Sequence, residues 1–225
     1  MSAGCSMHRL ATRDHGAPPH SGWRARVFAF AILKVNARYE RWIAARKRPL
    51  LRDLRGVVLE IGPGAGVNLR HYDRSVRWIG IEPNPYMQTY LRREAERCAF
   101  QLDLRTGIAE RLDLADESMD AVVCTLVLCS VSNVKQVLKE IRRVLKPGAP
   151  FVFIEHVAAP QATLLRCLQD WLKPVMAYFA EGCHPNRETW TAIKDAGFSN
   201  VRLDHFRAPV TVPILSPHIA GVAIR

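Results

Sequence analysis

The sequence predicts an α/β domain in which a mostly parallel sheet of seven strands carries helices on both faces. Three observations lead to this prediction: short apolar runs alternate with helix-compatible segments, a glycine-rich turn follows the first run, and acidic residues close the first two runs. Near-continuous apolar strands are typical of parallel sheets that helices cover on both sides. A chain of 225 residues with 48% hydrophobic content can bury the core of one such domain.

Each element follows from its local pattern. Apolar runs predict strands at residues 57–61, 78–82, 100–106, 121–126 and 151–156. Residues 133–145 have the 3.6-residue apolar spacing of an amphipathic helix, which residues 146–148, Lys-Pro-Gly, should end. Helix-like segments follow at 162–180 and 187–196, and residues 201–207 and 219–224 should form a closing hairpin. We expect Trp171 and Trp190 to belong to the core.

The chain divides into three parts. Residues 1–22 are polar and rich in His, Arg, Pro and Gly, which predicts a disordered tail. Residues 23–55 form a basic amphipathic helical segment, and residues 56–225 form the α/β domain. The helical segment can lie at a membrane interface with its aromatic side chains inward, or it can pack on the sheet as a lid over a ligand pocket. The two roles are compatible, and both remain open at this point.

Charge is unevenly distributed along the chain. Residues 1–56 hold 12 Lys and Arg against three acidic residues, whereas residues 57–225 hold 20 against 18. The α/β body is therefore nearly neutral, which argues against a nucleic-acid groove across it. The N-terminus has no recognisable signal peptide, and its longest apolar run, residues 27–33, is too short to span a bilayer. We expect a cytoplasmic protein that is at most peripheral to a membrane.

The six cysteines form no C-x-x-C pair and have no metal-ligand spacing. We therefore expect reduced thiols and no bound metal, as in a cytosolic protein. Cys124 and Cys129 lie in an apolar run, so both are expected to be buried.

The most informative motif is the turn at residues 60–66, Glu-Ile-Gly-Pro-Gly-Ala-Gly, between the first strand and a helix-compatible segment. Glycines there let backbone N–H groups approach a ligand without interference from Cβ atoms, and the leading acid suits a ligand with a positive charge. A second acid, Glu82, lies 22 residues after Glu60 at the tip of the next strand, where it can accept both ribose hydroxyls of a nucleoside. Residues 107–110 and 116–123 would flank an adenine ring.

These three elements, in this order, resemble the class I S-adenosylmethionine-dependent methyltransferases, whose fold is Rossmann-like. The resemblance implies S-adenosylmethionine as the cofactor, with Glu60 at its ammonium group, Glu82 at the ribose and Thr125 at the edge that faces the methyl group. Pro63 stands where the family usually has Cys or Ala, which keeps the turn but removes one backbone donor. The expected cofactor-binding residues are Glu60, Gly62, Pro63, Gly64, Gly66, Asn68, Glu82, Pro83, Asn84, Ala109, Glu110, Thr125 and Leu126.

The residues after the fourth expected strand constrain the methyl acceptor. Methyltransferases that act on exocyclic adenine or amide nitrogens usually carry Asp/Asn/Ser-Pro-Pro-Tyr/Phe there, whereas residues 124–130 of this chain read Cys-Thr-Leu-Val-Leu-Cys-Ser. Methylation of base or amide nitrogens is therefore disfavoured. An apolar floor instead suits a small, lipophilic acceptor.

A narrower resemblance extends from about residue 35 to the C-terminus. It rests on residues 122–131, 155–159, 170–174, 182–183, 187–190, 197–199 and 217–221. Together these segments look like the methyltransferase-like 7 family, the alkyl-thiol S-methyltransferases. The resemblance implies methyl transfer to a small lipophilic thiol or to sulfide, with a role in detoxification. Members of that family have an apolar N-terminal membrane anchor, and this chain departs from them because its N-terminus is more basic and less apolar.

A thiol acceptor is chemically reasonable. A thiol with a pKa of about 8.5 is partly ionised near neutral pH, and the thiolate is the nucleophile. In-line displacement from a sulfonium needs positioning more than activation. We expect His156, at the tip of the fifth strand, and Thr125 to be catalytic, with a structural role as the alternative for His156. The expected acceptor-site residues are Tyr39 on the N-terminal helix, Cys129 (as a packed thiol, not a nucleophile), His156, His184 and His218.

Two other functions remain open. The first is a methyltransferase that acts on a lipid, a quinone or another small oxygen, nitrogen or carbon acceptor, because the same apolar pocket fits both classes. The second is a non-catalytic binding module, whose sign would be a broken cofactor loop, and this loop is intact. In each case we expect a monomer that does not bind nucleic acid.

Overall fold

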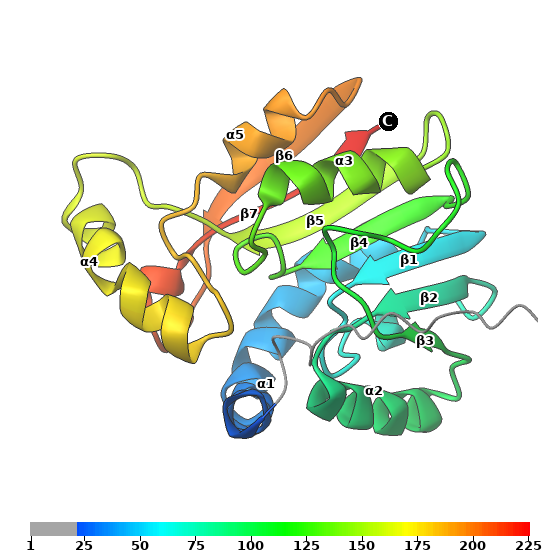
Figure 1. The fold of residues 1–225 in the computed structure, drawn as a ribbon, viewed down its shortest axis with the longest axis horizontal. Helices are drawn as coiled ribbons and strands as arrows, with labels where there is room; N and C mark the ends of the chain where they lie inside the picture. The colour runs from blue at the N-terminus through cyan, green and yellow to red at the C-terminus, as the bar shows by residue number, and fades with distance from the viewer. Residues whose placement is uncertain (1–21) are drawn as a thin grey trace, which may run out of the picture.

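The computed structural model describes residues 22–225, without the side chains of residues 24 and 31–37. The tail predicted at residues 1–22 lies outside this range except for Gly22. Seven strands form one sheet in the order β3-β2-β1-β4-β5-β7-β6 (Figure 1). The strands are β1 Val57–Ile61, β2 Arg77–Ile81, β3 Asp103–Arg105, β4 Ala121–Thr125, β5 Pro150–His156, β6 Asn200–Arg207 and β7 Pro217–Ile224.

The sheet is parallel except for β7. Strand β1 pairs in parallel with β2 and β4, β2 with β3, and β4 with β5. Strand β7 runs antiparallel to both of its neighbours, β5 and β6. The expected hairpin is therefore β6–β7, and it folds back so that the later strand lies beside β5. This arrangement confirms the predicted seven-stranded, mostly parallel sheet.

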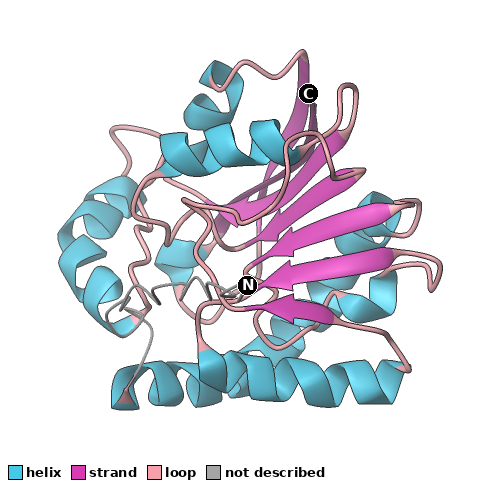
Figure 2. Cartoon of the chain, turned by 45° about the vertical axis from the view of Figure 1, so that its right-hand side comes forward, coloured by secondary structure: helices cyan, strands magenta, loops and turns pink. Residues whose placement is uncertain are grey.

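Helices cover both faces of the sheet, with α1 and α2 on one side and α3 and α5 on the other (Figures 1 and 2). Alternate residues of β1 divide between these faces: Val58 packs in a cluster with Leu91 of α2, and Leu59 packs in a cluster with Ile141 of α3. The helices are α1 Trp23–Leu51, η1 Leu69–His71, α2 Pro85–Cys98, α3 Val134–Val144, α4 Leu164–Phe179, α5 Thr189–Asp195 and η2 Pro213–Leu215.

Asparagine side chains start the two helices that follow β2 and β4. Asn84 accepts a hydrogen bond from Tyr86 N–H at 2.9 Å, and Pro85 occupies the first position of α2. Asn133 accepts a hydrogen bond from Gln136 N–H at 3.1 Å and starts α3. Both helices therefore begin beyond the carboxyl ends of parallel strands, where ligands bind in open α/β sheets.

Strand β3 is shorter than the predicted 100–106. Helix α2 ends at Ala99 in the left-handed conformation, with φ of 49°, and Phe100 N–H donates to the Ala95 carbonyl at 2.9 Å. Residue 100 is therefore still part of the turn that ends the helix, and pairing with β2 begins only at Asp103.

Helix α4 is the exception to the helical cover, because it stands away from the sheet (Figure 1). Trp171 is 75% exposed, so the prediction that it belongs to the core is wrong. Trp190 of α5 does pack against the core beside α3, as predicted. Across residues 22–225, no helix combines the length and the apolarity that crossing a bilayer requires.

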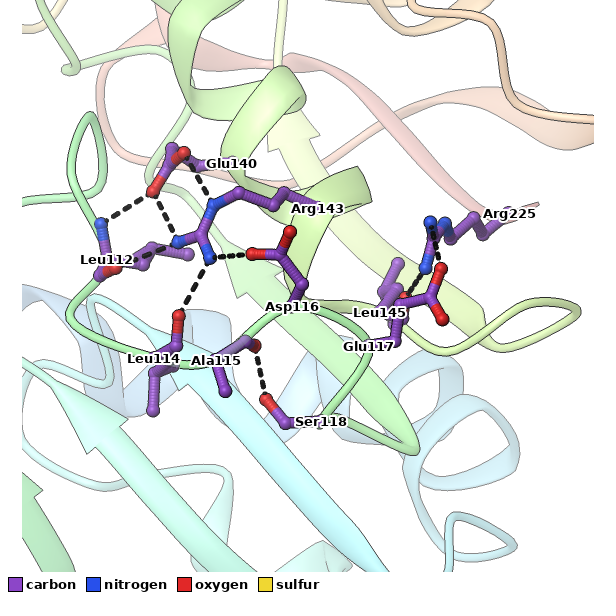
Figure 3. A network of polar contacts seen from close by, with 10 residues as sticks. All are labelled: Leu112, Leu114, Ala115, Asp116, Glu117, Ser118, Glu140, Arg143, Leu145 and Arg225. Atoms are coloured by element: carbon purple, nitrogen blue, oxygen red, sulfur yellow. Dashed lines mark hydrogen bonds and ion pairs between the residues drawn. The ribbon is translucent and has the colours of Figure 1, made fainter.

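The loop between β3 and β4 is anchored to α3 (Figure 3). Arg143 donates hydrogen bonds to the carbonyl oxygens of Leu112 and Leu114, at 2.9 and 2.7 Å. Glu140 accepts from Leu112 N–H at 2.9 Å and pairs with Arg143, whose guanidinium lowers the pKa of the Glu140 carboxyl. These contacts hold in place the loop that carries residues 109 and 110.

Candidate active site

A cavity of about 1560 Å³ opens at the carboxyl ends of β1, β2 and β4. It is larger than the roughly 300–1,000 Å³ of most ligand pockets, so it can hold a nucleoside-sized molecule together with a small second one. Its wall includes the turn after β1, the start of the β2–α2 connection, the β3–β4 loop, the β4–α3 loop, one side of α1 and the end of α4. The expected cofactor residues on it are Gly62, Pro63, Gly64, Asn68, Glu82, Pro83, Ala109, Glu110, Thr125 and Leu126.

The glycines of the turn after β1 serve two different purposes. Gly62 and Gly66 have φ of 61° and 80°, and an added Cβ would lie 2.6 Å from Val127 Cγ2 and 2.4 Å from Leu91 Cδ1, respectively. These two glycines let the turn pack closely against the protein, and Gly66 does not line the cavity. Gly64 has φ of 55°, and an added Cβ would meet nothing within 4 Å. It therefore borders open space, as a backbone that must face a ligand requires.

Glu82 joins two loops at the cavity wall. Its Oε2 accepts a hydrogen bond from Gly64 N–H and its Oε1 accepts one from Asn84 N–H, both at 2.9 Å. The side chain is buried, yet it borders the cavity. A carboxylate is an acceptor only, as a contact with ribose hydroxyls requires. This geometry fits the expected contact with a ribose.

Asn84 does not line the cavity but holds its outer wall together. Besides capping α2, its Nδ2 donates to the Ala25 carbonyl at 3.3 Å and to Glu181 Oε1 at 3.0 Å. One side chain thus connects the start of α1 with the segment after α4. Its described contacts join these two segments to the start of α2.

Glu60 lies behind the cavity wall and is 1% exposed. Its carboxylate accepts hydrogen bonds from Asn68 Nδ2 at 2.8 Å and from Tyr72 Oη and Trp78 Nε1, both at 2.9 Å. Burial raises the pKa of Glu60, and the three donors oppose that shift because they stabilise the carboxylate. Glu60 therefore does not line the cavity itself, whereas its partner Asn68 does.

Asn68 lines the cavity and links Glu60 to Thr125. Its Nδ2 donates to Glu60 and also to Thr125 Oγ1, at 3.1 Å, which fixes the orientation of the amide. The opposite atom, Oδ1, is buried and has no hydrogen-bond partner within the described part of the protein. A buried acceptor without a partner costs about 1–3 kcal/mol, so the site is suited to a ligand that brings a donor such as an ammonium group. The residues present therefore fit S-adenosylmethionine.

The opposite end of the cavity carries the residues expected at the adenine. Glu110 Oε1 accepts hydrogen bonds from Ser132 N–H at 2.8 Å and Asn133 N–H at 3.3 Å, so it connects the β3–β4 loop with the start of α3. Leu126, the first residue after β4, has φ of 59°, a strained conformation for a branched side chain. That conformation turns the chain sharply at the cavity wall.

The residues expected at the acceptor do not line the cavity. Tyr39 and His218 are buried and joined by a hydrogen bond of 3.2 Å between Oη and Nε2. His156 is also buried, with its Nε2 3.1 Å from Cys183 Sγ, and Cys129 is 2% exposed. These four residues, among them the expected base His156, thus lie behind the cavity wall in this structure, and their contact with an acceptor stays a prediction.

The reason is that the α4–α5 connection covers the tip of β5. Residues 182 and 183 lie against the β4–α3 loop, and His184 N–H donates to the Cys129 carbonyl at 2.9 Å. Ser130 and Gly182 form the cavity wall in front of the buried layer. His184 is half-buried beside this wall and does not line the cavity either. Such a connection depends on long-range packing, which strand spacing does not reveal.

Two buried side chains that the sequence did not indicate lie at the cavity: Glu155 supports this wall, and Lys47 is on the α1 side. Glu155 is fully buried, and its carboxylate accepts hydrogen bonds from the N–H groups of residues 127, 128 and 129 at 2.9, 3.0 and 3.4 Å. Lys47 of α1 lines the cavity and donates to Glu40 Oε2 at 2.7 Å. Glu155 could have been noticed in the sequence, because it is an acid at the last-but-one position of an apolar strand. Lys47 could not, because it is one of many cations in a basic helix.

Comparison with known proteins identifies the family of this chain. Residues 59–153 match the family described as methyltransferase domain. Thiol S-methyltransferase TMT1A of Homo sapiens is 35% identical over 209 residues, which cover 88% of this chain and 86% of the human protein. Thiol S-methyltransferase TMT1B of Rattus norvegicus is 37% identical with the same coverage.

A solved SAM-dependent methyltransferase from Aquifex aeolicus is similar in fold, with a TM-score of 0.57 over 91% of this chain and 99% of that chain, at 14% identity. Its sequence is too distant to say more than that the folds agree. The two thiol S-methyltransferases are 35% and 37% identical to this chain over 88% of its length. This chain therefore belongs to the S-adenosylmethionine-dependent thiol S-methyltransferase family.

Proposed function

We propose that this protein transfers a methyl group from S-adenosylmethionine to the sulfur of a small lipophilic thiol. The observation that carries the acceptor class is the 35–37% identity to thiol S-methyltransferases over 88% of the chain. The apolar lining beside Thr125 agrees with it, because Leu126, Val127 and Val131 on one side face the cavity together with Ala177 and Phe179 from α4. Such a surface suits an alkyl or aryl group.

The residues of this chain act mainly by positioning. When bound, S-adenosylmethionine supplies a methyl group on a sulfonium, which needs no further activation. Asn68 Oδ1 would accept from the ammonium group, and Glu82 from the ribose hydroxyls. Thr125 Oγ1 accepts from Asn68 Nδ2, so the hydroxyl hydrogen of Thr125 can be donated into the cavity. A thiol that is partly ionised near neutral pH can react from such a pose without a strong base.

We assign His156 a supporting role behind the wall, not that of a base in contact with the acceptor. It is 6% exposed and contacts Cys183, whereas the neighbouring Gly182 is the residue that reaches the cavity. Thr125 is the catalytic candidate that borders the cavity. Because Thr125 borders the cavity and His156 does not, Thr125→Val should lower kcat. His156→Gln should instead lower the stability of the protein.

An acceptor panel tests the proposal. Release of S-adenosylhomocysteine would be measured with alkyl thiols, aryl thiols and sulfide, and in parallel with quinols and phospholipids. The proposal expects product only with the sulfur compounds, and loss of that product in Glu82→Ala. Turnover of a quinol or a phospholipid without turnover of any thiol would support the alternative acceptor class and contradict the proposal.

We also propose a peripheral contact with anionic membrane surfaces, made by a monomer. Exposed apolar side chains lie at helical spacing on α1, at Trp23 and Val27, and on α4, at Leu164, Leu168 and Trp171. Both helices border the cavity, so a lipophilic acceptor could enter from the bilayer. The charge of the N-terminal segment, 12 Lys and Arg against three acids in residues 1–56, favours anionic lipid.

Vesicle co-sedimentation tests this contact. The full chain should sediment with vesicles of phosphatidylcholine and phosphatidylserine, and less so at high salt. The double substitution Leu168→Ser and Trp171→Ser should weaken sedimentation, whereas Lys194→Ser on α5 should leave it unchanged. Equal sedimentation of all three proteins would contradict the assignment, and sedimentation equilibrium of the free protein would test the monomer.

A further inference from the structure

Three buried side chains from distant parts of the sequence meet behind the cavity wall. Cys129 follows β4, His156 is the last residue of β5, and Cys183 lies between α4 and α5. The two sulfur atoms and an imidazole nitrogen all lie within 4.8 Å of one another, and His156 Nε2 is 3.1 Å from Cys183 Sγ. The three residues are 2–6% exposed, so this is a buried cluster and not a surface coincidence.

We propose that Cys129, His156 and Cys183 form a binding site for a thiophilic metal ion, specifically Zn²⁺. Two thiolates and one imidazole are a donor set that zinc prefers. Zinc bonds of about 2.3 Å to sulfur and about 2.0–2.1 Å to nitrogen place neighbouring ligand atoms roughly 3.5–3.8 Å apart in a tetrahedron. The three ligand atoms lie within 4.8 Å of one another, and His156 Nε2 and Cys183 Sγ are 3.1 Å apart, so shifts of about 1 Å or less would bring them to these separations.

Within the described residues, one nitrogen of the His156 ring has a contact and the other has none. Its Nδ1 is buried and has no hydrogen-bond partner within the described residues. Buried polar atoms of this kind are rare in folded proteins, because each one costs free energy unless a ligand or a water molecule satisfies it. The nitrogen that faces the cluster is the other one, Nε2, which lies beside Cys183 Sγ.

The position of the cluster gives the metal a consequence for the enzyme. Cys129 precedes Ser130 and Cys183 follows Gly182, and these two neighbours form the cavity wall. A Cβ added at Gly182 would lie 2.8 Å from the Ser130 carbonyl oxygen, so the two loops are already in close contact. An ion bound by Cys129 and Cys183 would tie these loops to β5. Because it binds the folded chain, it would raise thermal stability.

The first measurement needs no substitution. The untagged full chain, stripped with a chelator under reducing conditions, would be titrated with Co²⁺ and then with Zn²⁺. We expect a thiolate-to-cobalt charge-transfer band that saturates at about one ion per chain and is displaced by Zn²⁺. Absence of this band in the reduced protein would overturn the proposal.

Matched substitutions locate the site. Cys129→Ser and Cys183→Ser should each lower the Zn²⁺ affinity by about 100-fold or more and abolish the Zn²⁺-dependent rise in Tm, as loss of a ligand requires. Cys167→Ser, at an exposed cysteine on α4 outside the cluster, should retain both. Equal affinity in all of these proteins would contradict the assignment. Circular dichroism establishes whether each variant is folded. If a variant does not fold, the cobalt spectrum of the unaltered chain still tests the metal site.

Discussion

Replacing Glu82 by alanine should weaken the binding of S-adenosylmethionine without unfolding the protein. Glu82 holds the turn after β1 through Gly64 N–H and the β2–α2 connection through Asn84 N–H, each at 2.9 Å. Its carboxylate also borders the cavity, where the ribose hydroxyls are expected. The substitution therefore removes two contacts within the protein and the proposed contacts with the ligand.

The expected size of the effect follows from these contacts. A hydrogen bond to a charged group contributes about 1.5–3 kcal/mol, and two ribose hydroxyls would form two such bonds. Water that enters the emptied space offsets part of this loss, because Glu82 lies at the edge of the cavity. We therefore expect a loss of about 3 kcal/mol, which corresponds to a roughly 100-fold higher Kd. Glu82→Gln keeps one acceptor oxygen and should lose about tenfold.

Titration calorimetry with S-adenosylhomocysteine and S-adenosylmethionine would measure Kd for both variants. Glu96→Ala, at an exposed acid on α2, is the matched control and should bind like the unaltered protein. Urea denaturation of each protein separates weaker binding from weaker folding. Affinity within about twofold of the original in a folded Glu82→Ala protein would refute the assignment of Glu82 to the ribose.

Three further predictions concern groups around the cavity. Tyr72→Phe removes a donor to the buried Glu60 carboxylate and should lower the free energy of unfolding in urea by about 2 kcal/mol; an unchanged value would contradict the buried network. His71 has its pKa lowered to about 4, first by burial, so the unfolded chain binds more protons between pH 4 and 6.5. Stability should therefore fall from pH 6.5 towards 4, less steeply in His71→Gln; parallel curves would contradict this. Gly182 has φ of 85°, and the Cβ added by Gly182→Ala would lie 2.8 Å from the Ser130 oxygen. The substitution should raise the acceptor KM, measured by initial rates, more than the cofactor Kd, measured by calorimetry. Equal changes in the two constants would contradict this.

Much of the fold could be predicted because its signals are local. The apolar runs of β1, β2, β4 and β5 and the helical period of α3 each lie within about a dozen residues, and the structure confirms them within a residue or so at their ends. Helix α2 also has a local signal, Asn84-Pro85 followed by apolar Met87, Leu91 and Ala95. Our prediction of the elements followed the apolar strands and did not use it.

The parts that escaped prediction depend on packing between distant segments. Trp171 resembles a core residue in sequence, but α4 leaves the sheet, so its apolar side faces outward. His156 lies at the tip of β5 as expected, yet the α4–α5 connection brings Cys183 over it.

Glu60 shows the same limit at the cofactor site. Its place at the end of β1 was predicted from the glycine turn. Its burial depends on Tyr72 and Trp78, which reach it from the next loop and strand. Sequence patterns thus indicate which residues come to the end of the sheet, but not which side chains shield them from a ligand.

Transfer of a labelled methyl group tests the central claim most directly. The purified full chain would be incubated with S-adenosylmethionine carrying a trideuterated methyl group and an aryl or alkyl thiol, and the products identified by mass spectrometry. The account predicts a methyl thioether that carries the three deuterium atoms on sulfur, formed by the unaltered protein and reduced in Glu82→Ala. An unlabelled or unmethylated thiol, in protein that binds the cofactor, would contradict it.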